Sequence, residues 1–583
     1  MRKSVFARLF SCMEGSRALL IFSALSALLS VLLSLTAPLV IGRAIDRMLG
    51  LRRVDFAGIS KTLLLLTLIY LGSNLFLWLL TYLTNRISYR TVNRLRRQLF
   101  EKLNTLALAF FDRNPHGDTI SRFVNDTDIV SDGMLQGIMA LLSGVLTILG
   151  SVAFMLCLNP LMTLVVVLSA PAAYFIARFI ARRSQQLFRE QVKELGLLGG
   201  YAEEMIQGEK VVKAFRYEDE AYARFREINA RLYGAGVKAQ FISSLSNPAT
   251  RIVNNVTYAL IGIIGGLAAI SGRLTVGDIS SFLIYAVLFS KPFNDITNIF
   301  TQLQSAAASA QRVFHILDLP PEAQDTPDAA ELKNCSGHVS FRNVRFSYEP
   351  GRKLIENFTL EVPPGSSIAI VGHTGAGKTT LVNLLMRFYE IEGGSIAVDG
   401  TDIREIKKSS LRGNFGMVLQ DTWLFDGSIR DNIAYAKPEA TMEEIAAAAK
   451  AAGADGFIRR LAKGYDTVIR GDGESLSQGQ MQLLTIARVL LANPPMIILD
   501  EATSSIDTYT ERRVQEAFSK ITAGRTSFVI AHRLSTVKNA DRILVMEKGR
   551  IVEQGRHEQL LAQGGAYAEL YSSQFKGAEA ASL

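Results

Sequence analysis

One stretch decides the fold of the second half of this chain: Gly372-His373-Thr374-Gly375-Ala376-Gly377-Lys378-Thr379. It matches the phosphate-binding loop (P-loop) pattern G-x-x-x-x-G-K-[ST]. The apolar run Ser366–Val371 before it reads as a strand, and Thr380–Tyr389 after it reads as the start of a helix. Glycines let backbone N–H groups wrap phosphate oxygens, and the N-terminus of a helix attracts anions. The sequence therefore predicts a nucleotide site in which Lys378 reaches the β- and γ-phosphates and Thr379 binds Mg²⁺.

A second predicted strand carries the acidic residues that such a site needs. Met496–Leu499 is an apolar run that ends in Asp500 and Glu501. In this position Asp500 can hold Mg²⁺ through water, and Glu501 can polarise the water that attacks the nucleotide. Short strands of this kind alternate with helical segments in the second half of the chain, and this alternation predicts an α/β domain.

Several further motifs follow in a fixed order along the same domain. They are Tyr348 in FSYEPG, Gln420 in VLQD, Leu476-Ser477-Gln478-Gly479-Gln480, Ser504-Ser505-Ile506-Asp507 and His532 in IAHRLST. Together with the P-loop and the acidic strand, these motifs make the chain from about Val339 to Tyr571 similar to an ABC ATPase domain. In that family they correspond, in the same order, to the aromatic that stacks on adenine, the Q-loop glutamine, the signature motif, the D-loop and the switch histidine.

The resemblance implies that this domain binds ATP and Mg²⁺, and it implies roles for individual residues. The implied catalytic residues are Glu501, His532 and Gln420. The implied nucleotide-binding residues are Tyr348, Gly372, His373, Thr374, Gly375, Ala376, Gly377, Lys378, Thr379, Thr380, Ser477, Gln478, Gly479, Gln480 and Asp507. The implied Mg²⁺ ligands are Thr379, Gln420 and Asp500.

The first half of the chain is rich in long apolar stretches. With 49% hydrophobic residues and a mean hydropathy of +0.20, the 583-residue chain is more apolar than ordinary soluble proteins. Six stretches have about the 20 residues that a membrane-spanning helix needs: Arg17–Ile41, Lys61–Thr84, Leu135–Leu158, Leu161–Ile180, Val253–Ile270 and Ile279–Phe300. The expected fold class is a membrane α-helical domain with six spans and long cytoplasmic extensions, followed by an α/β P-loop ATPase domain.

Basic residues indicate the orientation in the membrane. The long loops after the second and fourth stretches, about Asn85–Met134 and Ala181–Arg251, are rich in Lys and Arg, as cytoplasmic loops are. Four arginines between the first two stretches run against this rule, but the two long loops contain more basic residues. We therefore expect a multi-pass protein of the cytoplasmic (inner) cell membrane, with the ATPase domain and both termini in the cytoplasm. The net charge of +9 is explained by these loops and needs no nucleic-acid partner.

Composition also suggests the limits of the domains. Residues 317–337, rich in Pro, Asp and Ala towards their start, are expected to link a transmembrane domain at 1–316 to a nucleotide-binding domain at 338–583. The N-terminal stretch MRKSVFARLFSCMEGSR predicts an amphipathic helix that lies on the membrane surface.

The membrane half resembles the exporter type of the ABC family, in which six spans precede the ATPase on one chain. Phe110-Phe111-Asp112 and Gly208–Phe215 are similar to the family's two coupling segments, which dock on the ATPase near Gln420. The resemblance implies ATP-driven efflux of hydrophobic or amphipathic compounds, drugs or lipids, by alternating access.

The signature motif implies that a second half-transporter is required. In the family, Ser477 and Gly479 would complete the ATP site of a partner subunit, so one chain makes only one half of a dimer. The commonest signature is LSGGQ, and here Gln478 replaces the first of its two glycines. Such changes occur in heterodimeric exporters, so the sequence favours a heterodimer, with a homodimer as the alternative.

The substrate is less defined by the sequence. Aromatic and polar candidates within the spans are Trp78, Asn254, Asn255, Phe289 and Phe293. Lys291 and Asp295 stand four residues apart and could pair on one helical face. Alternative functions are a lipid flippase, a peptide exporter, an importer with the exporter fold, and a nucleotide-gated channel. A soluble ABC protein would lack the six spans.

Overall fold

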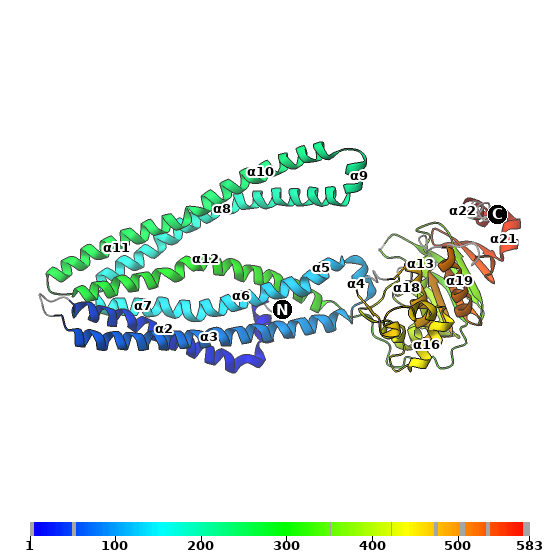
Figure 1. Ribbon diagram of the computed structural model, residues 1–583, viewed down its shortest axis with the longest axis horizontal. Coiled ribbons are helices and arrows are strands. Elements are labelled where there is room, and N and C mark those ends of the chain that lie inside the picture. The colour runs from blue at the N-terminus through cyan, green and yellow to red at the C-terminus, as the bar shows by residue number, and fades with distance from the viewer. Residues whose placement is uncertain are drawn as a thin grey trace. The chain divides into compact units, whose positions relative to one another are not determined.

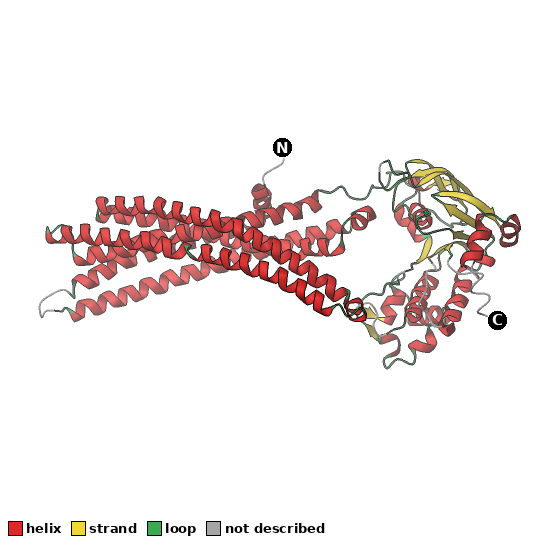
Figure 2. Cartoon of the chain, turned by 90° about the horizontal axis from the view of Figure 1, so that it is seen from above, coloured by secondary structure: helices red, strands yellow, loops and turns green. Residues whose placement is uncertain are grey.

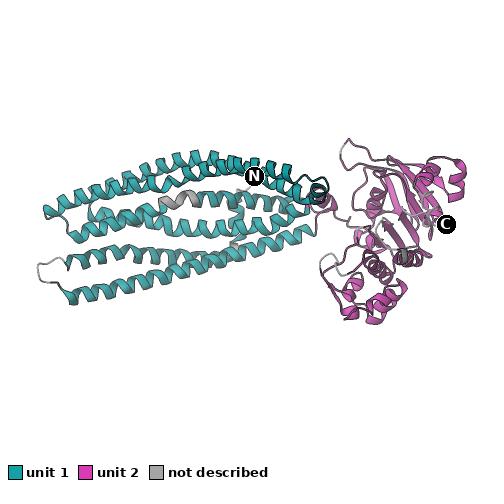
Figure 3. Cartoon of the chain, turned by 45° about the horizontal axis from the view of Figure 1, so that its top comes forward, with its two compact units in different colours: residues 1–104, 116–319 teal, residues 105–115, 320–583 magenta. Residues whose placement is uncertain are grey.

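The computed structural model describes residues 5–48, 54–349, 351–420, 422–470, 476–500, 508–531 and 537–574. The chain separates into two compact units, residues 1–104 with 116–319 and residues 105–115 with 320–583 (Figure 3). The first unit is built from helices, and the second combines helices with strands (Figure 2). The predicted combination of a helical domain with an α/β domain is confirmed. The domain limits at residues 316 and 338 stay predictions.

Long helices make up the first unit. In chain order they are α1 (Val5–Cys12), α2 (Arg17–Asp46), α3 (Phe56–Leu103), α5 (His116–Ser121), α6 (Thr127–Met139), α7 (Val145–Leu158), α8 (Pro160–Gln207), α9 (Glu209–Ala214), α10 (Glu218–Ser244), α11 (Ser246–Ile270) and α12 (Val276–Asp318). Polar caps set where two of them begin. The Asn159 side chain accepts a hydrogen bond from the Met162 N–H, and Thr275 and Asp278 form a reciprocal capping box at the start of α12.

Five of these helical stretches are long and apolar enough to cross a membrane: Arg17–Met48, Phe56–Leu103, His116–Leu158, Pro160–Gln207 and Glu218–Ile270. They contain the first five predicted spans. The sixth, Ile279–Phe300, lies within the continuous helix α12. The side chains of residues 293–298, including the candidates Phe293 and Asp295, lie outside the described residues. The count of six spans therefore stays a prediction.

A row of polar contacts joins α2 to the beginning of α12, and we call it the α2–α12 interlock. Its members are Leu35, Pro38, Asp46, Thr275, Gly277, Ser281 and Tyr285. The Tyr285 hydroxyl donates to the Leu35 carbonyl, and the Ser281 hydroxyl donates to the Pro38 carbonyl at 2.8 Å. The Asp46 carboxylate accepts from the Thr275 hydroxyl and the Gly277 N–H, both at 2.8 Å. The first and last long helices are thus fastened together along several turns.

Helices α8, α10 and α11 form an arm that diverges from the other helices, with the short helix α9 at its tip (Figure 1). Apolar side chains are exposed along this arm, including Phe179 and Phe241. At the tip, Val211 and Phe215 are also exposed. Large apolar side chains that stay uncovered in one chain indicate contact with lipid or with another protein.

The N-terminal helix α1 packs on the helical bundle. Leu9 and Met13 are buried in a cluster that includes Leu95 of α3 and Phe314 of α12. Arg8 lies over the Phe314 ring and forms a two-bond ion pair with Asp318, at 2.6 and 2.8 Å. This helix therefore packs Leu9 against the bundle and leaves Phe10 exposed, and its place on the membrane surface stays a prediction.

Two main sheets form the core of the second unit. The strands are β1 (Val339–Phe346), β2 (Ile355–Val362), β3 (Ser367–Val371), β4 (Gly393–Val398), β5 (Thr401–Asp402), β6 (Phe415–Val418), β7 (Gly427–Ser428), β8 (Val468–Ile469), β9 (Met496–Asp500), β10 (Thr526–Ile530), β11 (Arg542–Glu547) and β12 (Arg550–Gly555). The larger sheet has the order β12-β11-β3-β10-β9-β6, with all neighbours parallel except β11 and β12. The smaller sheet, β2-β1-β4-β5, is antiparallel.

The second unit also contains helices. They are α4 (Leu108–Arg113), α13 (Lys378–Leu385), α14 (Lys408–Gly413), α15 (Ile429–Ala434), α16 (Met442–Ala451), α17 (Asp455–Ile458), α18 (Gln478–Ala492), α19 (Thr508–Thr522), α21 (His557–Gln563) and α22 (Ala566–Gln574). The central strands β9 and β10 are buried nearly throughout, as parallel strands with both faces covered should be. Because β3 and β9 run parallel with one strand between them, the residues that follow them meet at one edge of the sheet.

Candidate nucleotide site

The P-loop connects β3 to α13 at the carboxyl edge of the larger sheet. Two glycines show why this sequence is needed. Gly377 has a φ of 97°, which side chains rarely tolerate, and it caps the N-terminus of α13. A Cβ atom on Gly372 would lie 2.3 Å from the Met546 carbonyl oxygen. The loop can therefore curl tightly against the sheet, as a loop whose backbone amides cradle phosphates must.

The side chain of Lys378 folds back over this loop. Its ammonium group donates to the carbonyl oxygens of Gly372 at 2.6 Å and His373 at 3.1 Å. Burial lowers the pKa of Lys378 below its ordinary value, and the nearby charge of Asp500 opposes part of that shift. The loop thus carries a partly desolvated cation, as the binding of phosphate oxygens requires.

A cavity of about 670 Å³ lies at this edge and collects most of the predicted nucleotide-binding residues. Its lining includes Tyr348, Thr374, Gly375, Ala376, Gly377, Lys378, Thr379, Thr380, Gln420 and Asp500. The predicted Mg²⁺ ligands therefore come together from the P-loop, the segment after β6 and the end of β9. A hydroxyl, an amide oxygen and a carboxylate make an oxygen-rich set that fits Mg²⁺. The cavity therefore holds both phosphate-binding residues and candidate metal ligands.

Tyr348 lies at the rim of this cavity, between two other aromatic rings. Its ring contacts Phe346 and Tyr389 edge-on, with centroids 4.9 Å apart in both pairs. Its hydroxyl bonds to Thr380 at 3.2 Å. The predicted stacking on adenine stays a prediction. Arg352 and Lys353 also line the cavity and were missed from the sequence, although the basic pair follows Tyr348 in FSYEPGRK.

The signature motif is built in the same unit but away from this cavity. Ser477 caps α18: its hydroxyl accepts from the Gln480 N–H at 3.3 Å, and the Gln480 side chain accepts from the Ser477 N–H at 2.9 Å. Among the described residues that line the cavity, none belongs to Ser477, Gln478, Gly479 or Gln480. The structure therefore separates the two groups of residues that were predicted to bind ATP.

Three predicted residues, Glu501, Asp507 and His532, lie outside the described residues. The preceding residues are described: Asp500 ends β9, and Ala531 directly follows β10, the neighbouring parallel strand. The catalytic roles of Glu501, His532 and Gln420 stay predictions.

The first predicted coupling segment contacts the nucleotide-binding unit through α4. The Tyr389 hydroxyl donates to the Asp112 carboxylate, and Arg113 donates to the Tyr348 carbonyl at 2.8 Å. Burial raises the pKa of Tyr389, and the bond to Asp112 raises it further. These contacts lie at the rim of the nucleotide cavity, beside the residue expected to hold adenine. The second predicted segment forms α9 at the tip of the arm.

Comparisons with known proteins agree with this arrangement. The family described as ABC transporter transmembrane region matches residues 20–293, and the family described as ABC transporter matches residues 355–504. An uncharacterized ABC transporter ATP-binding protein of Bacillus subtilis is 44% identical over 574 residues, covering 98% of this chain and 95% of the relative. A fatty acid ABC transporter ATP-binding/permease protein of Mycobacterium bovis is 45% identical over 517 residues, covering 89% and 82%.

A solved structure extends the similarity to the fold. A bacterial Atm1-family ABC exporter with ATP bound superposes with a TM-score of 0.77 and 30% identity, covering 96% of this chain and 98% of the other. The expected family is confirmed. This chain belongs to the ABC transporter family, as a membrane protein whose ATP-binding domain acts as an ATPase coupled to transport.

Proposed function

We propose that this chain is one half of a dimeric exporter that moves amphipathic molecules out of the cytoplasm across the cytoplasmic membrane. The observation that carries the proposal is the separation of the P-loop cavity from the signature motif. Each is half of an ATP site, so a second ATPase domain is needed to close it. Mg²⁺ would be held by Thr379, Gln420 and Asp500, and it would neutralise charge on the phosphates. The exposed apolar tip at Val211 and Phe215 supports a partner chain as well.

The expected partner is a different half-transporter, because Gln478 replaces a signature glycine that would face the partner's nucleotide. A chain purified alone in detergent should show the mass of one 64.0 kDa polypeptide with ATP present. Its ATP hydrolysis should stay at least about tenfold below that of a co-expressed pair, because neither ATP site is complete. A stable dimer of this chain with full activity would refute the heterodimer and leave the homodimer.

Transport is tested most directly in sealed inside-out vesicles. The relative from Mycobacterium bovis is named a fatty acid transporter, so a labelled long-chain fatty acid is the first probe. We expect ATP-dependent accumulation inside such vesicles and none with a non-hydrolysable ATP analogue. Accumulation only in right-side-out vesicles, with ATP inside, would show an importer instead.

Lys291 supports an anionic group on the substrate. It lies fifteen residues along α12 from Val276, about 22 Å at 1.5 Å per residue, and thus within a hydrocarbon core of about 30 Å. The large residues Phe282 and Tyr285 face the buried side of the helix, whereas Val287 and Lys291 are exposed. A lysine turned to lipid costs about 3 kcal/mol, so an interior cavity is its favourable environment.

Among the side chains that the structure describes, none forms an ion pair or hydrogen bond with Lys291. We propose that the carboxylate or phosphate of the substrate supplies the counter-charge. Asp295 was predicted as the intrahelical partner, and its side chain lies outside the described residues.

The variant Lys291→Met is expected to raise the concentration of fatty acid needed for half-maximal ATPase stimulation by about 10-fold, because a buried ion pair is lost. Lys291→Arg keeps the charge and should remain within about threefold of the parent. The fatty alcohol of equal length is the control substrate, and its effect should not change. Equal losses for acid and alcohol would contradict charge recognition.

A further inference from the structure

Two segments of the second unit stand next to the long helices in sequence. We call residues 105–115, which follow α3, the first connector, and residues 320–326, which follow α12, the second connector. Both contact the residues directly after the P-loop helix α13, at 386–390. Within the second unit, the segments that follow α3 and α12 in sequence thus meet at the end of the P-loop helix.

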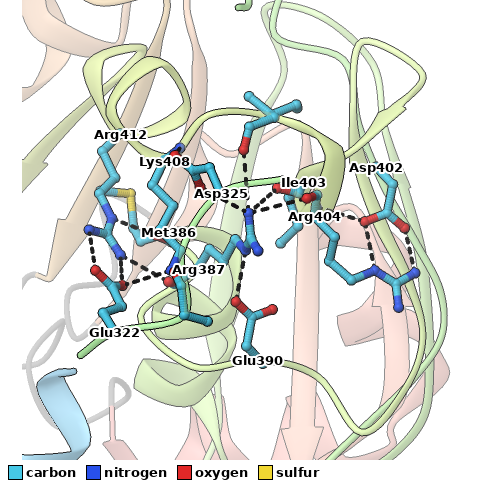
Figure 4. Close-up of polar contacts among 12 residues, drawn as sticks. Glu322, Asp325, Met386, Arg387, Glu390, Asp402, Ile403, Arg404, Lys408 and Arg412 are labelled. Atoms are coloured by element: carbon cyan, nitrogen blue, oxygen red, sulfur yellow. Dashed lines mark hydrogen bonds and ion pairs between the residues drawn. The ribbon is translucent and has the colours of Figure 1, made fainter. Parts of the chain in front are cut away.

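Arg412 fastens the second connector to the end of α13. Its guanidinium donates to the Glu322 carboxylate at 2.6 Å, and it also donates to the carbonyl oxygens of Met386 at 3.2 Å and Arg387 at 3.0 Å (Figure 4). The group further lies over the Phe388 ring at 5.0 Å. Carbonyls at the end of a helix have no partner within the helix. One planar cation therefore satisfies the end of the P-loop helix and holds the connector at the same time.

Glu322 is ionised in this arrangement. Burial raises the pKa of its carboxyl group, but the hydrogen bond and charge of Arg412, together with Lys408, outweigh burial and lower it overall. The Lys408 ammonium lies 3.3 Å from the same carboxylate and also donates to the Ala323 carbonyl. Arg412 and Lys408 thus both bind the second connector, a few residues after the end of α12.

Arg387 strengthens the same contact from the other side. Its guanidinium is buried, lies 3.6 Å from Asp325 of the second connector, and donates to Glu390 at 2.9 Å and the Ile403 carbonyl at 3.1 Å. Its φ of 50° is unusual for a residue with a side chain. Such a conformation persists when surrounding contacts hold it, and these bonds do so.

The first connector reaches the same region. Tyr389 bonds to Asp112, as described above, and the Glu322 N–H donates to the Thr105 carbonyl at 2.7 Å. This last bond ties the two connectors directly to each other. Residues far apart in sequence are therefore linked by hydrogen bonds and ion pairs into one group, which we call the connector hub: Asp112, Glu322, Arg387, Tyr389 and Arg412.

One short helix, α13, separates the connector hub from the P-loop. Helix α13 begins at Lys378 and has 8 residues, so it is about 12 Å long. We propose that Glu322 and Arg412 are positioning residues for energy coupling within one chain. Through α13 they transmit the movement of the P-loop on nucleotide binding to both connectors at once. This inference rests on the proposed transport function only for its physiological meaning, because ATP-driven movement can be measured without any substrate.

The test measures that movement in the assembled transporter. The three native cysteines are replaced, and spin labels are placed at exposed positions of the helical unit, Phe56 and Ile270. The distance between the labels is recorded with and without ATP. In the parent protein ATP is expected to shift the population to a new distance. In Glu322→Gln the shifted fraction at saturating ATP should fall at least about fivefold, the lower end of common coupling strengths.

Two further variants separate positioning from general stability. Arg412→Lys keeps the charge, but a single ammonium cannot bond Glu322 and both carbonyls together, so it should lose coupling as well. Glu331→Gln is the matched control, because Glu331 forms an exposed ion pair of 2.7 Å with Lys407 in the same part of the chain. Glu331→Gln should show the same ATP-dependent shift in distance as the parent. The Kd for ATP should rise together with the loss of coupling in Glu322→Gln and Arg412→Lys, because coupling is reciprocal, and it should stay unchanged in Glu331→Gln.

The outcomes are distinct. An unchanged shift in Glu322→Gln would overturn the proposal, and so would an equal loss in Glu331→Gln. A shift that recovers fully as the ATP concentration is raised would also overturn it, because Glu322 would then act only on ATP binding. The expected pattern in all three variants, combined with no transport of fatty acid, would count only against the proposed substrate.

Discussion

The variant Glu501→Gln is expected to hydrolyse ATP about 100- to 10,000-fold more slowly than the parent, the range that a general base contributes, and to bind ATP as the parent does. Glu501 follows Asp500, which lines the nucleotide cavity together with Lys378 and Thr379. Glutamine keeps the size of the side chain but cannot accept a proton from the attacking water. Phosphate release and the binding of a fluorescent ATP analogue, measured on the same sample, check both parts of the expectation.

Lys378→Ala provides the comparison for this experiment. It should abolish hydrolysis as well, but by a different route, because it removes the cation that lies over the loop between Gly372 and His373. The Kd for ATP should therefore rise at least about 10-fold in Lys378→Ala and stay unchanged in Glu501→Gln. Hydrolysis at the parent rate in Glu501→Gln would remove this residue from the catalytic role.

The second large effect is expected at Gly549, in the turn between β11 and β12. Lys548 and Gly549 both have positive φ values, 47° and 76°, as this type of tight hairpin turn requires. A Cβ atom on Gly549 would lie 1.4 Å from the Leu354 carbonyl oxygen. The Gly549 N–H also donates to the Ala376 carbonyl of the P-loop at 3.0 Å. Alanine must therefore push the turn away from β2 and away from the P-loop.

We expect Gly549→Ala to destabilise the ATPase domain by about 3 to 5 kcal/mol, from overpacking and a strained backbone together. Thermal unfolding should shift down by about 10 °C. Gly524→Ala is the control, because Gly524 also has a positive φ of 71° but open space where its Cβ would stand. Gly524→Ala should lower the free energy of unfolding by about 1 kcal/mol. Equal unfolding temperatures for the two variants would show that the structure removes the clash with Leu354 without losing stability.

What could be predicted from the sequence depended on local patterns. The P-loop, its flanking strand and the apolar strand before Asp500 are each continuous in sequence, and the structure places them as expected. The capping box of Ser477 and Gln480 also follows from spacing alone. For these features a short window of residues contains the physical cause.

The features that were missed depend on contacts between distant residues. Asp112 and Tyr389 lie 277 positions apart, and Thr105 meets Glu322 across a similar gap, so no local pattern marks either contact. The N-terminal helix has an amphipathic pattern that suits a membrane surface and a protein surface equally. Its contacts with Phe314 and Asp318, at the far end of α12, could not be read from that pattern.

The α2–α12 interlock has a consequence for the resting population of conformers. Hydrocarbon offers no water to replace a broken hydrogen bond, so parting α2 from α12 leaves the Tyr285 hydroxyl unsatisfied, while Ser281 keeps only its bond to the Gly277 carbonyl of its own helix at 2.9 Å. Bonds of this kind between membrane helices contribute about 0.6 to 1.7 kcal/mol each. Two of them bias the equilibrium by about 10- to 300-fold towards the joined state. Thermal motion alone then rarely separates the two helices, whereas a ligand with a modest preference for the parted state can reverse the balance.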